Sequence, residues 1–301
     1  MQRRERMDTF GAVVLIGFAF LFGANQVMIK VMNGGYQPVF AAGARSAIAA
    51  LCILVWMWAR GLSPRVGPGA LPVSLALGLL FAAEFLCLFI ALDLTTVVRA
   101  TVVFYSMPVW LALAAHVFLP GERITPRKGA GLGLAFAGMA LALADRGEGT
   151  GASLTGDLLG LGAAMSWAAL ALLARKAGEQ GVGPQVQLFW MVAISAPVLL
   201  LASPLFGPLL RDPEPVHHLM LGLQSIVVVA VGMLVWLAML SIYPAAGVAS
   251  FSFLSPLFGL GLGWAILGET VGPLLLIAGA TVAAGILLIN LPGRKARAAA
   301  G

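Results

Sequence analysis

The sequence contains few charged residues. Only 10% of its 301 residues are Asp, Glu, Lys or Arg, whereas 60% are apolar, and the mean hydropathy is +0.99. Typical soluble domains carry about 25% charged residues. The chain is therefore not expected to fold as a soluble globular domain.

Residue types that commonly carry chemistry are also scarce. The two cysteines, Cys52 and Cys87, both lie in apolar stretches, so no disulfide framework is indicated. No metal site follows from the three histidines. The sequence has no Gly-x-x-x-x-Gly-Lys-Ser/Thr motif, so the chain is not itself an ATP-driven pump. We expect no cofactor and no enzymatic activity, because one deep carboxylate without a deep histidine does not make a catalytic pair.

Long apolar runs fill most of the chain. A helix that crosses a bilayer needs about 20 mostly apolar residues. Ten stretches qualify, at roughly 10–32, 37–59, 70–92, 95–118, 127–144, 155–176, 184–205, 217–242, 246–267 and 272–291. We therefore predict one all-α integral membrane domain over residues 1–301, with an uncleaved first span, short loops and no soluble catalytic domain.

The basic residues predict how these spans are oriented. With a cytoplasmic N-terminus and ten alternating spans, thirteen Lys and Arg residues fall on the cytoplasmic side and three on the other. The positive-inside rule requires this asymmetry and places both termini in the cytoplasm. The net charge of +6 is thus explained by topology, and no nucleic-acid partner is expected. The basic segment 294–301 is expected to be a disordered tail.

Two stretches repeat one pattern of Gly, Glu and Pro at a separation of 147 residues. The paired residues are Gly121 with Gly268, Glu122 with Glu269, Pro126 with Pro273 and Gly138 with Gly285. A polar stretch at 145–151 separates the halves, so we predict five-helix repeats over 1–150 and 151–293. Because five is odd, the second copy enters the membrane from the opposite face. Such inverted duplications are a common build for secondary transporters.

This pattern resembles the drug/metabolite transporter superfamily, and most closely its EamA-type branch of ten-span exporters. The residues that carry the resemblance are the paired segments like Pro108 to Gly138, together with Gly23, Asn25, Lys30 and Arg45. Phe22 departs from it, since many relatives have Trp there, and Ala278 departs from the Gly131 of the first copy. The resemblance implies a ten-helix basket, a central cavity formed mostly by spans 1, 3, 4, 6, 8 and 9, and a packing seam between spans 5 and 10. The cytoplasmic (inner) membrane of a bacterium is the expected location.

Glu84 is the only carboxylate that the sequence places deep in a span. A charge at the bilayer centre costs a few kcal/mol, so such a residue faces a cavity or a partner. Glu84 could carry a proton, bind an amine or only hold helices together. Arg45 could attract a substrate carboxylate, or pair with Asp93 or with carbonyls. Arg99 could extend to the external interface, and for both arginines structural anchoring is the preferred interpretation.

The remaining candidates are polar, aromatic and proline residues inside the spans. Pro108 and Pro256 remove helical hydrogen bonds and are predicted hinges. Glu122 and Glu269 follow Gly at turns and are predicted to cap the next helix. The predicted substrate-binding residues are Asn25, Glu84, Tyr105, Ser106, Trp110, Trp167, Gln224 and Ser252. Packing or interhelical hydrogen bonding is the alternative for each of them.

We therefore expect a secondary transporter that works by alternating access between the two repeats. Export of small organic metabolites follows from the resemblance, with neutral or aromatic amino acids as the first expectation. A carrier of drugs, sugars or nucleotide derivatives, or a facilitative channel, remains the alternative. The expected partners are a small-molecule substrate and the lipid bilayer, with a monomer expected and a dimer left open.

Overall fold

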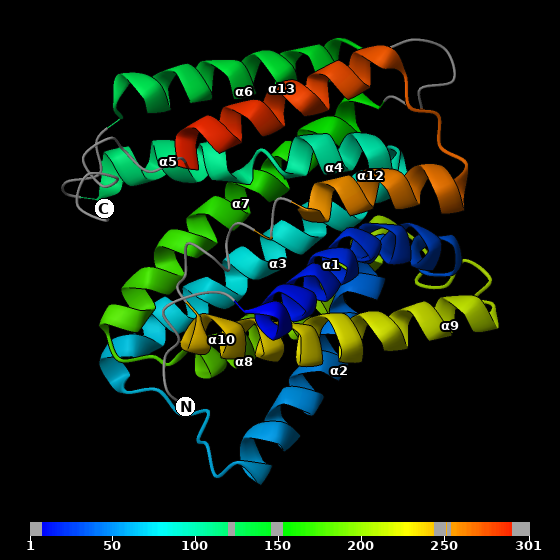
Figure 1. Ribbon diagram of the computed structural model, residues 1–301. Helices are drawn as coiled ribbons and strands as arrows, with labels where there is room; N and C mark the ends of the chain where they lie inside the picture. The colour runs from blue at the N-terminus through cyan, green and yellow to red at the C-terminus, as the bar shows by residue number, and fades with distance from the viewer. Residues whose placement is uncertain (1–7, 120–123, 146–152, 244–250, 252–253, 291–301) are drawn as a thin grey trace.

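The computed structural model describes residues 8–119, 124–145, 153–243, 251 and 254–290. These residues are almost entirely helical and contain no strand, only an isolated bridge between Tyr36 and Leu210. The helices are α1 (Thr9–Gly35), α2 (Pro38–Ala59), η1 (Pro68–Ala70), α3 (Leu71–Leu94), α4 (Val97–Phe104), α5 (Met107–Phe118), α6 (Pro126–Ala144), α7 (Leu154–Glu179), α8 (Pro184–Ala202), η2 (Ser203–Phe206), α9 (Pro215–Gly222), η3 (Leu223–Gly232), α10 (Met233–Ile242), α12 (Leu254–Leu267) and α13 (Pro273–Asn290). Figure 1 shows them as one bundle.

Equivalent residues of the two halves begin equivalent helices. The Asp8 side chain accepts a hydrogen bond at the start of α1, and Ser153, 145 residues later, does the same for α7. Pro38 is the first residue of α2 and Pro184 is the first residue of α8. Proline costs no helical hydrogen bond there, because the first N–H groups of a helix have no partner within the helix. The repeat seen in the sequence is thus a repeat of local folding signals.

Within the described residues, seven helical stretches are long and apolar enough to cross a membrane: Thr9–Gly35, Pro38–Ala59, Pro68–Leu94, Val97–Phe118, Leu154–Glu179, Pro184–Phe206 and Pro215–Met239. Leu254–Leu267 and Pro273–Ile289 are apolar but shorter. The predicted all-α class is confirmed for the described residues. Helix occupies part of each of the ten expected ranges, whereas ten crossings stay a prediction.

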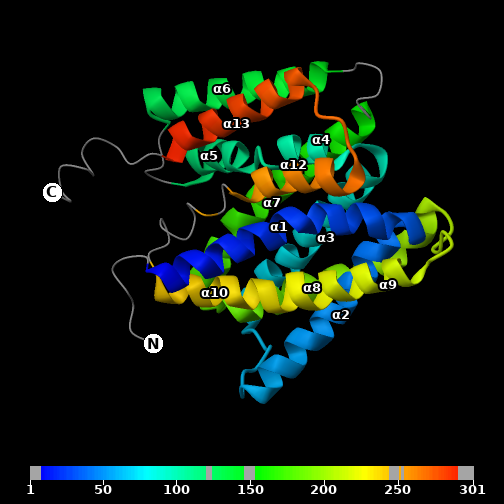
Figure 2. The same ribbon diagram turned by 45° about the vertical axis from the view of Figure 1, so that its right-hand side comes forward.

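The helices pack in pairs that relate the two halves. Helices α6 and α13 lie side by side and run antiparallel (Figures 1 and 2), and α2 packs against α8. Helix α3 packs on α7, and the equivalent contact is that of α1 with α9 and η3. Helix α1 also packs on α12, and the equivalent contact is that of α7 with α4 and α5. Each of these contacts between the halves has a counterpart in which the two halves exchange roles. This is the arrangement that an approximate two-fold axis produces.

Glycines set the close approach of α6 and α13. A Cβ added to Gly131 would lie 2.7 Å from the Gly285 carbonyl oxygen, and one on Gly285 would lie 2.5 Å from the Gly131 carbonyl oxygen. A Cβ on Gly138 would lie 2.7 Å from the carbonyl oxygen of Ala278. Gly138 and Gly285 are equivalent positions of the two halves, as are Gly131 and Ala278. The contact between Gly131 and Gly285 is therefore the counterpart of the contact between Ala278 and Gly138. The packing expected between spans 5 and 10 is observed.

The fourth predicted span is broken rather than kinked. Helix α4 ends at Phe104 and α5 begins at Met107, so Pro108 lies in the first turn of a new helix. At the break, the Ser106 hydroxyl donates to the Val103 carbonyl at 2.6 Å. Because Pro108 has no N–H and its ring would crowd the preceding turn, the chain restarts its helix there. The eighth predicted span is also irregular, since η3 is a ten-residue π-helix between two α-helices.

Candidate functional site

The first of two cavities, named here the charged cavity, lies between the two halves of the chain. Its volume is about 210 Å³. The lining comes from α1, α2 and α3 on one side and from α7, α8, η3 and α10 on the other: Phe22, Asn25, Arg45, Phe81, Glu84, Phe85, Trp167, Leu170, Ala171, Ala174, Met191, Val228, Val229 and Met233. Opposite charges therefore meet in an otherwise aromatic and aliphatic chamber.

Three phenylalanine rings lie against the Arg45 guanidinium. Phe81, Phe85 and Phe89 follow each other at four-residue intervals on α3, which puts them on one helix face. The guanidinium carbon of Arg45 lies 3.6 Å from the Phe85 ring centre, 5.7 Å from that of Phe81 and 5.4 Å from that of Phe89. Attraction between a cation and an aromatic face strengthens away from water. Arg45 is thus fixed on one wall of the cavity.

Glu84 and Arg45 are buried, and each keeps an atom without a partner. Their side chains are 3% and 1% exposed. Among the described residues no hydrogen bond reaches Glu84 Oε2 or Arg45 Nε. No ion pair within 4.0 Å joins the two side chains, and the Arg45 guanidinium donates only to Ser46 Oγ, at 3.5 Å. Leaving buried charges without close partners is expensive, so this arrangement favours a ligand-binding use.

Two amides lie beside the charged pair. Gln224 Nε2 donates to Asn25 Oδ1 at 2.9 Å, while Gln224 Oε1 has no partner within the part of the chain that the structure describes. Gln224 belongs to the π-helix η3, and π-helical segments occur frequently at functional sites. Asn25 and Trp167 both line the charged cavity. Sequence reasoning gave no sign of the π-helix, because its apolar residues also fit an α-helix.

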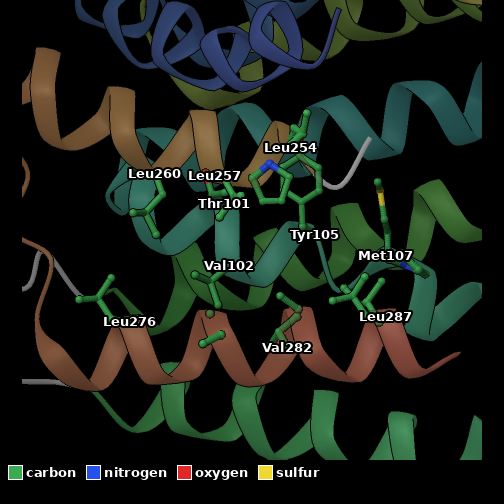
Figure 3. A pocket seen from close by; sticks show the side chains of 16 residues that line it. Thr101, Val102, Tyr105, Met107, Leu254, Leu257, Leu260, Leu276, Val282 and Leu287 are labelled. Atoms are coloured by element: carbon green, nitrogen blue, oxygen red, sulfur yellow. The ribbon is translucent and has the colours of Figure 1, made fainter. Parts of the chain in front are cut away.

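The second cavity, named here the apolar cavity, is larger, at about 460 Å³. It lies between α4, α5, α12 and α13 (Figure 3). Its lining is Thr101, Val102, Tyr105, Met107, Pro108, Leu254, Pro256, Leu257, Leu260, Leu276, Gly279, Ala280, Val282, Ala283, Ile286 and Leu287. It has two polar side chains, Thr101 and Tyr105, and the Thr101 hydroxyl is engaged, since it donates to Gln26 Oε1 at 2.8 Å. Despite its size, this cavity offers a polar solute little, so we place the candidate site in the charged cavity.

The structure divides the predicted substrate-binding residues. Asn25, Glu84 and Trp167 line the charged cavity, with Gln224 behind Asn25. The central cavity implied by the resemblance involved spans 4 and 9, whereas the charged cavity uses α2 and α8 instead. Arg45 on α2 also lines the charged cavity, although the sequence favoured structural anchoring for it over contact with a substrate carboxylate. The sequence signal that could have placed Arg45 at the site is that a deep cation complements the deep carboxylate of Glu84.

The other candidates lie elsewhere. Tyr105 and both predicted hinge prolines, Pro108 and Pro256, line the apolar cavity. The Trp110 indole donates to Ser106 Oγ at 3.2 Å, and neither residue lines either cavity. Ser252 and Glu122 lie outside the described residues, so their predicted roles remain predictions.

Arg99 is anchored inside the bundle, as the preferred interpretation of the sequence had it, and does not extend to the external interface. Arg99 is 1% exposed, and its guanidinium donates to Asp157 Oδ2 at 2.8 Å. It also donates to the carbonyls of Ala142 and Asp145, both at 2.7 Å. Asp157 is fully buried, so Glu84 is not the only buried carboxylate of the bundle. Arg99 stays inside because Asp157 balances its charge, and it joins α4 to α6 and α7.

Glu269 caps a different helix from the one expected. Its carboxylate accepts hydrogen bonds from Val97 N at 2.7 Å and from Val98 N at 2.9 Å. These are free N–H groups of the first turn of α4, not of α13, which follows Glu269 in the chain. Helix α13 begins at Pro273, which has no N–H to cap. Glu269 therefore connects the second half of the chain to the first.

Polar contacts gather at one end of the bundle, which topology predicts to be external. Lys30 Nζ donates to the Thr95 carbonyl at 2.7 Å. Asp93 forms an ion pair with Arg211 at 2.7 Å, and not with Arg45, which was one of its possible partners from the sequence. Tyr36 bonds with His218. These bonds tie the end of α1 to the end of α3 and to α9, and they tie α3 to the connection that precedes α9.

Known proteins resemble the chain over nearly its whole length. The sequence profile described as the EamA-like transporter family matches residues 9–144 and again residues 154–291. An uncharacterized transporter, YvbV, from Bacillus subtilis is 28% identical, covering 99% of this chain and 97% of that protein. Probable amino-acid metabolite efflux pumps of Salmonella typhimurium and Escherichia coli are 28% and 27% identical, each covering 97% of this chain and 97% and 98% of their own lengths.

A solved crystal structure shares the fold. It aligns with a TM-score of 0.64 at 21% identity, over 94% of this chain and 98% of that one. The family profile matches both halves separately, as the internal repeat requires. The chain belongs to the EamA-like transporter family.

Proposed function

We propose that the protein is a secondary transporter that exports neutral or aromatic amino acids, with the charged cavity as its substrate site. The observation that carries the proposal is the placement of Arg45 and Glu84 together in a cavity shared by both halves. Ligand sites of transporters built from inverted repeats lie at such an interface. The names of the Salmonella and Escherichia relatives support amino-acid metabolites as cargo.

The proposed topology has ten spans in two inverted repeats, residues 1–150 and 151–293, in the inner membrane of a bacterium. The antiparallel pairing of α6 with α13 supports the inversion. The start of α1 and the end of α13 lie at the same end of the bundle in both views, which supports termini on one side. The excess of basic residues makes that side cytoplasmic.

Transport would proceed by moving one set of helices against the other around the charged cavity. The contacts Lys30–Thr95, Arg211–Asp93 and Tyr36–His218 would keep the external end closed and would break when it opens. The break between α4 and α5 and the π-helix η3 are natural places for helices to bend. Alternating exposure then needs no energy source other than solute or ion gradients.

The alternatives are carriers of drugs, sugars or nucleotide derivatives, and a facilitative channel. A volume of about 210 Å³ lies below the roughly 300–1,000 Å³ typical of sites for drug-sized ligands. The charged cavity also has one arginine and no lysine in its lining, which does not favour phosphorylated solutes. Small amino acids fit both its volume and its charges.

Counterflow in proteoliposomes tests the proposal. Vesicles loaded with unlabelled L-phenylalanine, L-leucine or L-alanine should transiently accumulate the labelled form of the same amino acid. Glucose, UDP-glucose and ethidium serve as probes of the alternatives. A channel would equilibrate the label without accumulation, because it does not couple inward to outward movement. Accumulation of only one of the alternative probes would refute the amino-acid assignment.

A further inference from the structure

We propose that Arg45 and Glu84 form a two-point clamp for the zwitterionic head group of an α-amino acid. The guanidinium binds the carboxylate, the Glu84 carboxylate binds the ammonium, and the aromatic walls receive the side chain. This inference deepens the proposed function and rests on the charged cavity being the substrate site. It names a recognition chemistry that distinguishes amino acids from amines and from carboxylic acids of the same shape.

The first argument is that the two charges face one chamber without contacting each other. Both side chains line the charged cavity and are more than nine-tenths buried. Glu84 Oε2 and Arg45 Nε lack hydrogen-bond partners in the described structure. Side chains held near, but out of contact with, a buried opposite charge suit a ligand that bridges them.

The second argument is that the clamp is held rigid before a ligand binds. The guanidinium carbon lies over the Phe85 ring at 3.6 Å from its centre, with the Phe81 and Phe89 rings also within 6 Å, so Arg45 has little freedom to swing toward Glu84. Glu84 is on the same helix as those rings, between Phe81 and Phe85. Preorganised charges bind a matching ligand without an ordering penalty.

The third argument is charge balance. An amine would satisfy Glu84 but would lie near the guanidinium, and a carboxylic acid would satisfy Arg45 but would lie near the carboxylate. Like charges placed together in a buried site cost several kcal/mol. A zwitterion satisfies both groups and leaves the net charge of the cavity unchanged. Transport of a bound zwitterion therefore brings no net charge into the membrane interior.

The side chain of the ligand meets aromatic and aliphatic walls. Phe22, Trp167, Leu170 and Met191 complete the lining around the charged pair. These residues offer no charge to a ligand side chain, so basic and acidic amino acids would bury an extra charge unpaired. The clamp therefore selects neutral α-amino acids, aromatic ones included.

Binding to the purified wild-type protein in nanodiscs tests the clamp without any substitution. Isothermal titration compares L-phenylalanine with phenethylamine, which lacks the carboxylate, and with 3-phenylpropionate, which lacks the ammonium. Hydrogen bonds to charged groups contribute enough for each lost head group to weaken binding by about 10- to 100-fold. Equal binding of either analogue overturns the clamp, as does failure of phenylalanine, leucine and alanine all to bind.

Two charge-removing variants sharpen the test through reciprocal effects. Glu84→Gln should weaken phenylalanine binding about tenfold or more and remove its advantage over 3-phenylpropionate. Arg45→Gln should instead remove the advantage over phenethylamine. Glu179→Gln and Arg175→Gln are matched controls, because they remove one charge each from an exposed pair on α7 outside the cavity. Unchanged discrimination in a folded Glu84→Gln or Arg45→Gln protein overturns the clamp.

Parallel counterflow separates this inference from the proposed function. Counterflow of amino acids without discrimination between phenylalanine and its two analogues would leave the transporter standing and remove the clamp. Discriminating binding without counterflow would support the clamp and remove the transport proposal. If a variant does not fold, the wild-type analogue series alone decides.

Discussion

Replacing Glu269 with alanine should destabilise the protein through a helix that begins 172 residues earlier in the chain. The carboxylate accepts two short hydrogen bonds, 2.7 Å from Val97 N and 2.9 Å from Val98 N. Both valines are fully buried, so water cannot replace the lost acceptor. The first turn of α4 would be left with two unsatisfied N–H groups and without the charge that complements its dipole.

The structure sets the size of the expected effect. A helix cap contributes about 0.5–2 kcal/mol, and leaving a buried donor unsatisfied costs about 1–3 kcal/mol. For two buried donors we expect a loss of about 2–4 kcal/mol in the free energy of unfolding. At roughly 2 °C per kcal/mol, the melting temperature should fall by about 4 °C or more. The melting temperature of Glu269→Gln should fall by less, because the amide oxygen of Gln still accepts one hydrogen bond.

The free cysteines provide the assay. Cys52 and Cys87 are partly buried and would react with a thiol-sensitive dye as the bundle unfolds. Glu179→Ala is the matched control, because Glu179 is an exposed carboxylate paired only with Arg175. If Glu269→Ala melts no lower than Glu179→Ala, the capping of α4 by Glu269 contributes nothing measurable and this reasoning fails.

Three further predictions concern the architecture. Reporter fusions at the C-terminus and within the 145–153 loop should lie on opposite sides of the membrane, and a common side would remove the ten-span topology. Gly285→Ala should lower folded yield by forcing α6 and α13 apart, at about 1–3 kcal/mol, whereas Gly133→Ala, with open space around it, should not; equal yields would contradict the close packing. Asp157→Asn should lower stability by about 3 kcal/mol, because it leaves the buried Arg99 with only its longer ion pair, 3.9 Å from Asp145; a melting temperature equal to that of wild type would show that the Arg99–Asp157 pair is dispensable.

The helices and their repeat were predictable because their signals are local. Apolar runs of span length and the Gly-Glu-Pro punctuation at a 147-residue offset each depend on residues close together in the chain. The contact of Gly131 with Gly285 follows from the same pattern, since small residues mark close helix packing. Local patterns also placed Glu84, Asn25 and Trp167 at depth in their spans.

Relations between distant segments were not predictable in this way. Nothing near Arg45 indicates that α2 faces the same chamber as Glu84 on α3, because that depends on how both pack against α7 and α8. The sequence around Glu269 suggests a cap for α13, whereas α4 lies within reach in the folded bundle. The sequence indicated no partner for the anchored Arg99 for the same reason, since Asp157 follows it by 58 residues.

Filling each cavity in turn tests most directly whether the charged cavity is the transport site. Ala171 lines the charged cavity and Ala280 lines the apolar cavity. Ala171→Phe should abolish counterflow of L-phenylalanine, while Ala280→Phe should leave it close to the wild-type rate, with both proteins matched for folded yield. Retained counterflow in Ala171→Phe together with its loss in Ala280→Phe would contradict the account and move the substrate to the apolar cavity.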